Sequence, residues 1–301
     1  MDKGNLLVKP YLKWAGGKSQ LLCNLQKRYP MSHDLSIKRY CEPFVGGGAV
    51  LFDVLSKFDM DKILINDINS ELINTYIQVK DNTHELLVLL QQMQDEYWAI
   101  SKQQRELYYY EKRDLFNKFK LKESIEIDLI KASLFIFLNR TCFNGLYRVN
   151  RQGHFNVPIG RYKQPVICDT ANLTSVSKAL KNVEIKCVDF SKCLDFIDDK
   201  TFVYIDPPYR PLNETSMFTS YTKNSFDDNE QIRLSKFVNA INLIGAKVII
   251  SNSDPKNTNH EDNFFDDLYK EYYIKRIDAK RMINCNGENR GNISELLITN
   301  Y

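Results

Sequence analysis

Short apolar runs alternate with amphipathic segments near both ends of the chain. The runs that predict buried strands occupy residues 39–45, 63–67, 183–188, 203–205, 247–251 and 293–299. Helical periodicity is clearest over residues 19–28, 49–57 and 227–244. This alternation of strands with helices is typical of an α/β fold in which helices cover a mostly parallel sheet, and we expect the last run to close the sheet near its edge.

The middle of the chain departs from this alternation. Residues 70–138 are helical in periodicity almost throughout, with apolar stripes such as Leu86, Leu90 and Met93. A helical stretch of this length interrupts the strand–helix pattern. We therefore predict an inserted domain over residues 70–165, between the two parts of the α/β domain at 1–69 and 166–301.

Composition excludes several classes of protein. With 301 residues, of which 43% are hydrophobic and 26% charged, the chain can bury one large core and a smaller second one. The seven cysteines include no C-x-x-C pair, and the four histidines lie far apart, so we expect free thiols in a reducing compartment and no metal site. No signal-type segment or bilayer-length apolar run is present. These features predict a cytoplasmic protein with no membrane partner.

The run at 203–205 leads into Asp206, Pro207, Pro208 and Tyr209. Because proline cannot continue a sheet ladder or enter a helix interior, the strand must end here in a stiff turn. The prolines keep their carbonyls but lack N–H groups, so the turn is rich in hydrogen-bond acceptors beside an aromatic ring. Such a turn suits a flat ring that carries an amine, although a plain strand-to-loop turn has the same residues. The loop that follows, residues 210–226, is either a simple connection or a lid ordered by substrate.

A second candidate site follows the first predicted strand. Three glycines, Gly46 to Gly48, separate that strand from a helix, and Asp67 ends the next strand 21 residues after Gly46. In doubly wound sheets a carboxylate at this spacing reaches the ribose of a nucleoside that lies over the glycine turn. Position 51 is Leu51, where a dinucleotide fingerprint requires glycine. The pattern thus favours an adenosine-type cofactor over a dinucleotide, while an ordinary strand–helix turn stays open.

Residues 139–163 form a basic window. It holds five cations and no acid, namely Arg140, Arg148, Arg151, Arg161 and Lys163, although the whole chain has a net charge of only +3. Aromatic residues and asparagines are interleaved with these cations, and glycines at 145, 153 and 160 predict a β-hairpin. Such residues neutralise phosphates, stack on bases and read base edges. A solvated basic loop is the simpler alternative; the pattern favours contact with nucleic acid.

Several of these motifs occur together in one family. They are Pro-Tyr-Leu-Lys-Trp-Ala-Gly-Gly-Lys at 10–18, Glu-Pro-Phe-Val-Gly-Gly-Gly at 42–48, Asn-Asp at 66–67, Asn-Gly-Leu-Tyr-Arg-Val-Asn at 144–150, Phe-Asn-Val-Pro at 155–158 and Asp-Pro-Pro-Tyr at 206–209. In this combination and order the chain closely resembles the Dam-like, alpha-group DNA adenine methyltransferases, which include GATC-specific enzymes of restriction-modification systems. The resemblance implies a Rossmann-like, S-adenosylmethionine-dependent methyltransferase sheet with an inserted helical, β-hairpin-bearing DNA-recognition domain.

The resemblance also implies roles for individual residues. Those matching catalytic positions are Asp206, Pro207 and Tyr209. Those matching S-adenosylmethionine-binding positions are Trp14, Lys18, Phe44, Gly46, Gly48, Asp67, Asp189 and Asp206. Those matching DNA-facing positions are Lys13, Phe143, Asn144, Leu146, Arg148, Pro158, Arg161 and Tyr162. Phe143 stands where some relatives have an intercalating tyrosine, so it keeps the stacking face and lacks the hydroxyl.

The expected activity is transfer of a methyl group to the N6 amine of adenine in double-stranded DNA, in GATC by resemblance alone. The resemblance further implies a cognate restriction endonuclease as a functional partner, whose existence the sequence leaves open. Two other readings remain at this point. One is an amino-methyltransferase that acts on RNA, protein or cytosine N4, and the other is a non-enzymatic nucleic-acid-binding protein; a dehydrogenase is a distant third.

Overall fold

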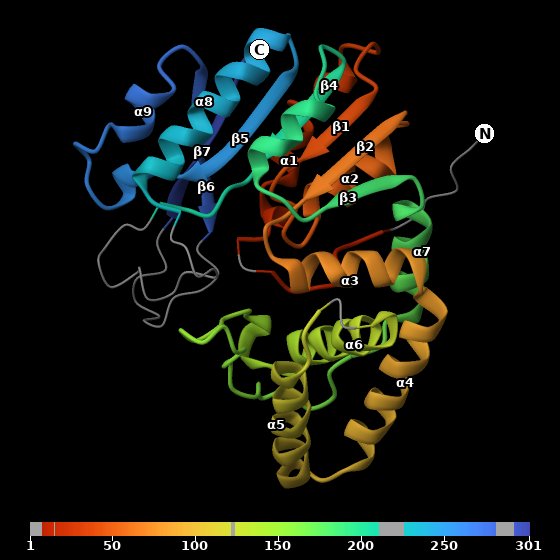
Figure 1. Cartoon of the computed structure of the whole chain (residues 1–301). Helices are drawn as coiled ribbons and strands as arrows, with labels where there is room; N and C mark the ends of the chain where they lie inside the picture. Colours follow the sequence, from red (N-terminus) through yellow and green to blue (C-terminus); the bar gives the residue numbers. More distant parts are fainter. Residues whose placement is uncertain (1–7, 15, 122–123, 211–225, 281–291) are drawn as a thin grey trace.

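A computed structural model describes residues 8–14, 16–121, 124–210, 226–280 and 292–301. Its strands form one seven-stranded sheet in the order β3-β2-β1-β4-β5-β7-β6 (Figure 1). The strands are β1 (Arg39–Glu42), β2 (Lys62–Asn66), β3 (Val183–Lys186), β4 (Thr201–Ile205), β5 (Lys247–Ser253), β6 (Tyr273–Lys280) and β7 (Asn292–Thr299). Strands β1 to β5 are parallel, and β7 runs antiparallel to both of its neighbours. The predicted α/β fold with a mostly parallel sheet is confirmed.

Helices cover both faces of the sheet because successive side chains of its strands point to opposite sides. In β4, Phe202 and Tyr204 join one apolar core, while Val203 and Ile205 join the other. The first core includes side chains from α1 (Leu22–Gln26), α2 (Ala49–Lys57), α3 (Ser70–Asp81) and α7 (Thr170–Leu180). The second includes side chains from α8 (Asp228–Ile244), α9 (Phe264–Leu268) and the 3-10 helix η4 (Phe190–Phe196).

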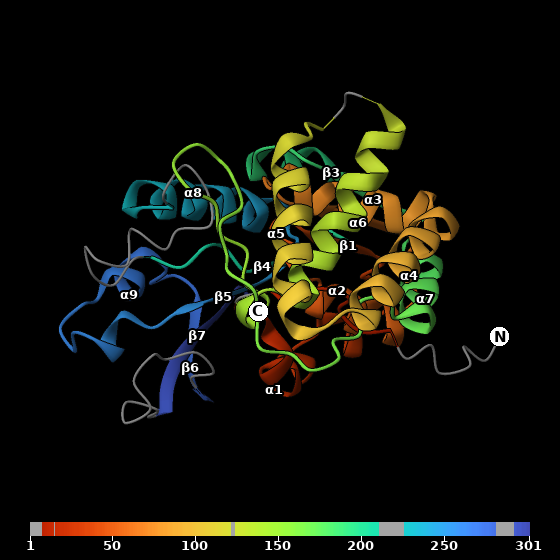
Figure 2. The ribbon, with the colours of Figure 1, turned by 90° about the horizontal axis from the view of Figure 1, so that it is seen from below.

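The inserted helices lie beyond α3. They are α4 (Thr83–Ala99), α5 (Lys102–Lys118) and α6 (Ile125–Thr141), and α6 packs against α3, α4 and α5. Figure 1 shows α3 between the sheet and these helices, and Figure 2 shows α4, α5 and α6 side by side from below. The helical periodicity is confirmed over this region. Because these helices share one continuous apolar core with a face of the sheet, the domain boundaries at 70 and 165 stay predictions.

Several predicted boundaries hold. Helix α2 spans the predicted residues, and α8 begins one residue later than predicted because Asp227 is its N-cap and accepts a hydrogen bond from the N–H of Glu230. Strand β1 ends at Glu42, three residues early, since the next residue is Pro43, which cannot donate to the ladder. The predicted helix over 19–28 is instead a 3-10 turn, η1 (Lys18–Gln20), followed by the short α1.

Two elements have weak sequence signals. Strand β6 is an edge strand, and its sequence YIKRIDAK carries charges that need solvent on one side, so it lacks an apolar run. Its partner β7 was expected near the edge and lies one strand inside it. Helix α7 has an ordinary mixed composition and is held by Asp169, whose side chain caps its first turn.

Candidate functional site

The carboxyl ends of β1, β2, β4 and β5 meet along one edge of the sheet, and the strand order reverses between β1 and β4. Ligands of doubly wound folds bind at this kind of reversal. The structure brings the turn at 206–209, the glycine turn at 46–48 and Asp67 to this edge, as their spacing predicts. Most of the candidate cofactor and catalytic residues therefore lie together.

Asp206 follows β4 directly, as the prolines after it require, and 21% of its side chain is exposed. Its Oδ1 atom lies 2.8 Å from Lys18 Nζ and accepts a hydrogen bond of 3.1 Å from the Ser251 hydroxyl. The Ser251 hydroxyl in turn lies 2.8 Å from that of Tyr204. Within the described ranges both polar partners of Asp206 meet Oδ1, which leaves Oδ2 for a ligand.

Lys18 contacts both Asp206 and Tyr209. Only 4% of its side chain is exposed, and its ammonium donates to the Gly16 carbonyl at 2.9 Å and to the Tyr209 hydroxyl at 2.7 Å, besides its ion pair with Asp206. Three N–H groups thus meet three acceptors. The ammonium also lies 4.7 Å from the centre of the Tyr209 ring. Lys18 therefore fixes the relative positions of the acid and the aromatic ring.

Burial and Lys18 act in opposite directions on Asp206. Burial raises the pKa of this carboxyl above its usual range, and the Lys18 ammonium opposes that rise. Burial also raises the pKa of the Tyr209 hydroxyl, with smaller contributions from the charges of Asp206 and Glu295. Tyr209 is therefore a neutral ring, while the charge of Asp206 depends on Lys18.

Contacts from α8 hold the other end of the turn. The Gln231 side chain is fully buried and donates to the Pro208 carbonyl at 3.2 Å. Arg210 donates to both carboxylate oxygens of Asp228, at 2.6 and 3.0 Å, and to Asp262 at 2.6 Å. These contacts support the rigid turn that the two prolines predict. The loop residues 211–225, predicted as a connection or lid, lie outside the described residues.

The glycine turn is closely packed. Gly46 (φ 47°) has no room for a side chain, because a Cβ would lie 2.9 Å from the Trp14 ring. The N–H of Gly46 donates to Asp67 Oδ2 at 3.1 Å, and Asn69 N–H donates to its Oδ1 at 2.9 Å. At Gly48 (φ 72°) a Cβ would lie 2.6 Å from the Tyr76 hydroxyl. Residues 46–48 thus form a surface without side chains, here called the glycine cradle, and the partly buried Asp67 carboxylate lies at its edge. Such a surface fits a ribose.

Aromatic rings border this cradle on one side. The rings of Phe44 and Phe190 are 5.3 Å apart, and Phe226 lies 5.8 Å from Phe44. Asp189 precedes Phe190, but both of its carboxylate oxygens accept hydrogen bonds of 2.8 Å from Arg233, which lowers its pKa. Phe44 thus lies among flat apolar rings that suit a purine. Asp189 lies beside these rings, and Arg233 binds its carboxylate.

The predicted recognition hairpin consists of two extended segments, here called its arms, that form no regular pair of strands. Two isolated antiparallel bridges join Cys142 to Ile159 and Val149 to Phe155, and residues 139–141 belong to α6. At its base the N–H of Phe143 donates to the Pro158 carbonyl at 2.9 Å. The chain reverses as the hairpin prediction requires, but the arms form isolated bridges in place of two regular strands. On one arm the Asn117 side chain binds both the N–H and the carbonyl of Phe155.

The DNA-facing candidates gather on these arms. Four of them are exposed to solvent beside Phe143, which is 50% exposed, namely Asn144, Arg148, Pro158 and Arg161. Leu146 is half-buried, and Asn144 has φ 54°, a conformation that asparagine tolerates better than most residues. The Arg148 guanidinium donates to the Asn156 side chain at 2.8 Å, so the hairpin itself holds this arginine. An exposed aromatic ring next to a fixed arginine is an arrangement that can contact bases.

The segment before Lys18 joins the hairpin to the sheet edge. The backbone of Lys13 exchanges two hydrogen bonds with the Asn139 side chain, at 2.8 and 2.7 Å, and its ammonium lies 4.1 Å from the Tyr162 ring centre. The next residue, Trp14, packs on the glycine turn and stacks on Tyr147 at 5.8 Å. Adjacent residues of one segment therefore contact the candidate DNA-facing arms and the glycine turn.

Sequence reasoning missed three supporting residues. Ser251 lies at the carboxyl end of β5, Gln231 on α8 and Glu295 on β7, where Glu295 accepts a 3.0 Å hydrogen bond from the Tyr209 hydroxyl. Polar residues at the end of an apolar strand were a usable signal for Ser251. Nothing local marks the other two, because the fold alone brings them to the turn.

In the described part of the chain, no group of three or more His, Cys, Asp or Glu side chains could hold a metal ion. Among the described cysteines, Cys23, Cys41, Cys142, Cys168 and Cys193 are free thiols. Among the described helices, none is long and apolar enough to cross a membrane.

The sheet order, the glycine cradle and the acceptor-rich turn define an α/β enzyme of the methyltransferase class. Residues 14–283 match the family described as D12 class N6 adenine-specific DNA methyltransferase, and the chain belongs to this family. The resemblance to Dam-like enzymes is thereby confirmed. The protein is an enzyme that methylates adenine N6 in DNA, and the dehydrogenase and non-enzymatic readings are excluded.

Three relatives match over nearly their whole length. The chain is 50% identical over 297 residues to "Type II methyltransferase M.MjaIII" of Methanocaldococcus jannaschii, covering 98% of this chain and 99% of the relative. It is 39% identical over 303 residues to "Type II methyltransferase M1.LlaDCHI" of Lactococcus lactis subsp. cremoris, covering 100% and 98%. It is 34% identical over 289 residues to "DNA adenine methylase" of Escherichia coli strain K12, covering 96% and 94%.

Proposed function

We propose that this enzyme transfers the methyl group of S-adenosylmethionine to the N6 amine of adenine in duplex DNA, with GATC as its target. The observation that carries the proposal is the position of Asp206. Its Oδ1 is held by Lys18 and Ser251, and it lies at the same sheet edge as the glycine cradle. The relatives named as type II methyltransferases favour a cognate restriction endonuclease as a functional partner.

The residues around the cradle fit S-adenosylmethionine. Gly46 and Gly48, where a side chain would not fit, would leave room for the nucleoside, and Asp67 beside Gly46 would bind the ribose hydroxyls. Phe44 would pack against the purine beside Asp189, while Trp14 and Lys18 border the cradle toward the catalytic turn. When bound, S-adenosylmethionine supplies an electrophilic methyl group on a sulfonium centre.

The target adenine poses two problems for the protein. Its amine is a weak nucleophile because the lone pair is delocalised into the ring, and within a duplex the amine is paired and out of reach. The base must therefore leave the helix. Asp206 Oδ2 and the Pro207 carbonyl would accept the two N–H groups and so orient the nitrogen lone pair, and Tyr209 would stack on the ring. Asp206 would stabilise the positive charge that develops on the nitrogen as the N–C bond forms and the methyl–sulfur bond breaks, and the amine would then lose one proton to solvent.

The hairpin presents the DNA to this site. Phe143 enters the base stack, and the neighbouring arms position Asn144, Leu146 and Pro158 against the bases. Arg161 meets the DNA from the same arm, and Lys13 and Tyr162 join the hairpin to the segment that leads to Lys18. This continuity explains how base recognition and base extrusion can occur together.

A set of duplexes that differ only at one site tests the proposal. With labelled S-adenosylmethionine, we expect transfer to a duplex with a single GATC, and none when both of its adenines already carry an N6 methyl group. We also expect little transfer to the same duplex with GTAC in place of GATC. Equal labelling of all three duplexes would contradict the assigned acceptor and target.

Arg148→Ala tests the role of the hairpin. Asn156 holds the guanidinium at the DNA-facing surface, and guanine is the base that arginine most often reads through paired hydrogen bonds. We expect discrimination between GATC and one-base variants to fall about ten- to a hundredfold, with a smaller loss of nonspecific affinity. Relative kcat/KM on the variant duplexes and fluorescence anisotropy measure these two quantities.

Arg151→Ala is the matched control, because Arg151 is an exposed arginine of the same hairpin. We expect it to weaken binding to all sequences alike and to lower the salt dependence of binding. A uniform loss of affinity with unchanged discrimination in Arg148→Ala would sink the role in base recognition.

A further inference from the structure

Glu295 contacts the catalytic turn from a remote part of the chain. It lies in β7, opposite Ser253 of β5, and its side chain is half-buried. The Tyr209 hydroxyl donates to Glu295 Oε2 at 3.0 Å across 86 positions of sequence. The carboxylate therefore reaches Tyr209 only because β7 is inserted between β5 and β6.

The donors and acceptors around Tyr209 allow only one arrangement of its two hydrogen bonds. Lys18 can only donate, so the Tyr209 oxygen accepts from its ammonium at 2.7 Å. The single hydroxyl hydrogen then points to Glu295, the acceptor at 3.0 Å. Since both hydroxyl functions are engaged, the ring has one preferred orientation beside Asp206.

The charged groups around Tyr209 do not balance. Lys18 is one cation between two carboxylates, Asp206 and Glu295, and its charge opposes the rise in the pKa of both. Burial is the main cause that raises the pKa of Glu295. With both acids ionised the cluster carries one excess negative charge, which suits a cationic ligand nearby.

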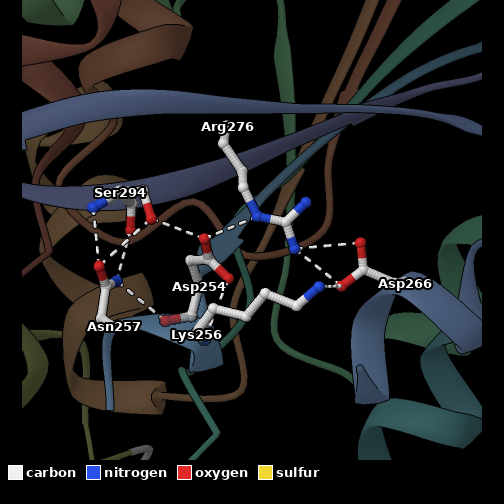
Figure 3. A network of polar contacts seen from close by, with 6 residues as sticks. All are labelled: Asp254, Lys256, Asn257, Asp266, Arg276 and Ser294. Carbon is white, nitrogen blue, oxygen red and sulfur yellow. Dashed lines mark hydrogen bonds and ion pairs between the residues drawn. The ribbon is translucent and has the colours of Figure 1, made fainter. Parts of the chain in front are cut away.

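The backbone around Glu295 is firmly held. The preceding residue, Ser294, exchanges two backbone hydrogen bonds with the Asn257 side chain, at 2.9 and 2.7 Å (Figure 3). Its hydroxyl donates to Asp254 Oδ2 at 2.6 Å. Asp254 is only 1% exposed and also accepts from Arg276 at 2.9 Å. This network joins the end of β5 to β6 and β7, so Glu295 starts from a fixed position.

We propose that Glu295 is a positioning residue for methyl transfer, which fixes the Tyr209 hydroxyl and thereby the ring on which the target adenine stacks. The inference rests on the proposed function of Tyr209. Strand β7 thereby supports the reaction, although it lies outside the turn at 206–209. Glu295 acts through Tyr209 and needs no contact with the substrates.

A double-mutant cycle tests this role. We expect Glu295→Ala and Tyr209→Phe each to lower kcat about ten- to a hundredfold, since each removes a hydrogen bond of a charged group, with KM for S-adenosylmethionine changing far less. The double variant is expected to be no slower than the worse single variant, because both changes break the same contact. Steady-state kinetics on a GATC duplex, with thermal unfolding of each variant, provide the data.

Two further variants complete the test. Glu295→Gln keeps an acceptor oxygen at the same position and is expected to restore most of the kcat that Glu295→Ala loses. Glu184→Gln changes an exposed glutamate of β3, far from the turn in the sheet order, and is expected to leave kcat unchanged.

The outcomes separate the two proposals. An unmodified enzyme that transfers no methyl group to the duplex would contradict the proposed function itself. Normal transfer by that enzyme, combined with losses that multiply in the double variant or with an unchanged kcat in folded Glu295→Ala, would overturn the role of Glu295 alone.

Discussion

Asp206→Ala is expected to lower methyl transfer by at least about a thousandfold, while binding of a GATC duplex stays within a few-fold of the unmodified enzyme. In the proposed mechanism the carboxylate both orients the target amine and stabilises the charge that develops on it, so its loss removes two contributions to the rate. In the proposed function, DNA affinity depends mainly on the hairpin at 142–159, whereas Asp206 makes its polar contacts with Lys18 and Ser251. Single-turnover transfer and fluorescence anisotropy measure the two effects separately.

Asp195→Ala is the control for Asp206→Ala. Asp195 is an exposed acid of η4, so its loss should change neither quantity. Turnover near that of the unmodified enzyme in Asp206→Ala would rule out the catalytic assignment.

Lys18→Met is expected to lower the rate at neutral pH about a hundredfold and to move the acidic limb of the pH–rate profile to higher pH. Burial raises the pKa of Asp206, and the main opposing influence is the Lys18 ammonium. Only the anion of Asp206 can stabilise the positive charge that develops on the amine in the proposed mechanism, so activity is expected to rise with pH through the pKa of this carboxyl. Without Lys18 this pKa rises further, and raising the pH should recover part of the lost rate.

The stability of the folded state should also depend on pH through the charge of Asp206. Because the pKa of Asp206 is raised in the folded state, protonation favours folding, and stability falls as the pH rises through that pKa. Lys18→Met should strengthen this dependence, whereas Lys57→Met, which removes a 40% exposed lysine paired with Asp53 away from the turn, should not. A pH–rate profile of Lys18→Met that coincides with that of the unmodified enzyme would show that Lys18 does not control the charge of Asp206.

Local patterns predicted the parts of the site that depend on local geometry. The two prolines after Asp206 end β4, and the three glycines separate β1 from α2. The 21-residue spacing brings Asp67 to the N–H of Gly46. Each signal reports a constraint on a few adjacent residues, and the parallel sheet then brings the ends of its strands together.

The remaining contacts arise from the order of the strands. Glu295 reaches Tyr209 because β7 enters the sheet between β5 and β6, and Ser251 reaches Asp206 because β4 and β5 are neighbours. Neither pairing can be read from periodicity. The hairpin shows the same limit, since its glycines predict a reversal of the chain but not that the Asn117 side chain binds both the N–H and the carbonyl of Phe155.

Methylation of random-sequence duplex DNA, followed by mapping of every modified base, tests the central claim most directly. The purified enzyme and S-adenosylmethionine suffice for this measurement, and Asp206→Ala provides the background. We predict N6-methyladenine at GATC in both strands and no modification by Asp206→Ala. Modified adenines without a common flanking sequence, or the same pattern from Asp206→Ala, would contradict the account.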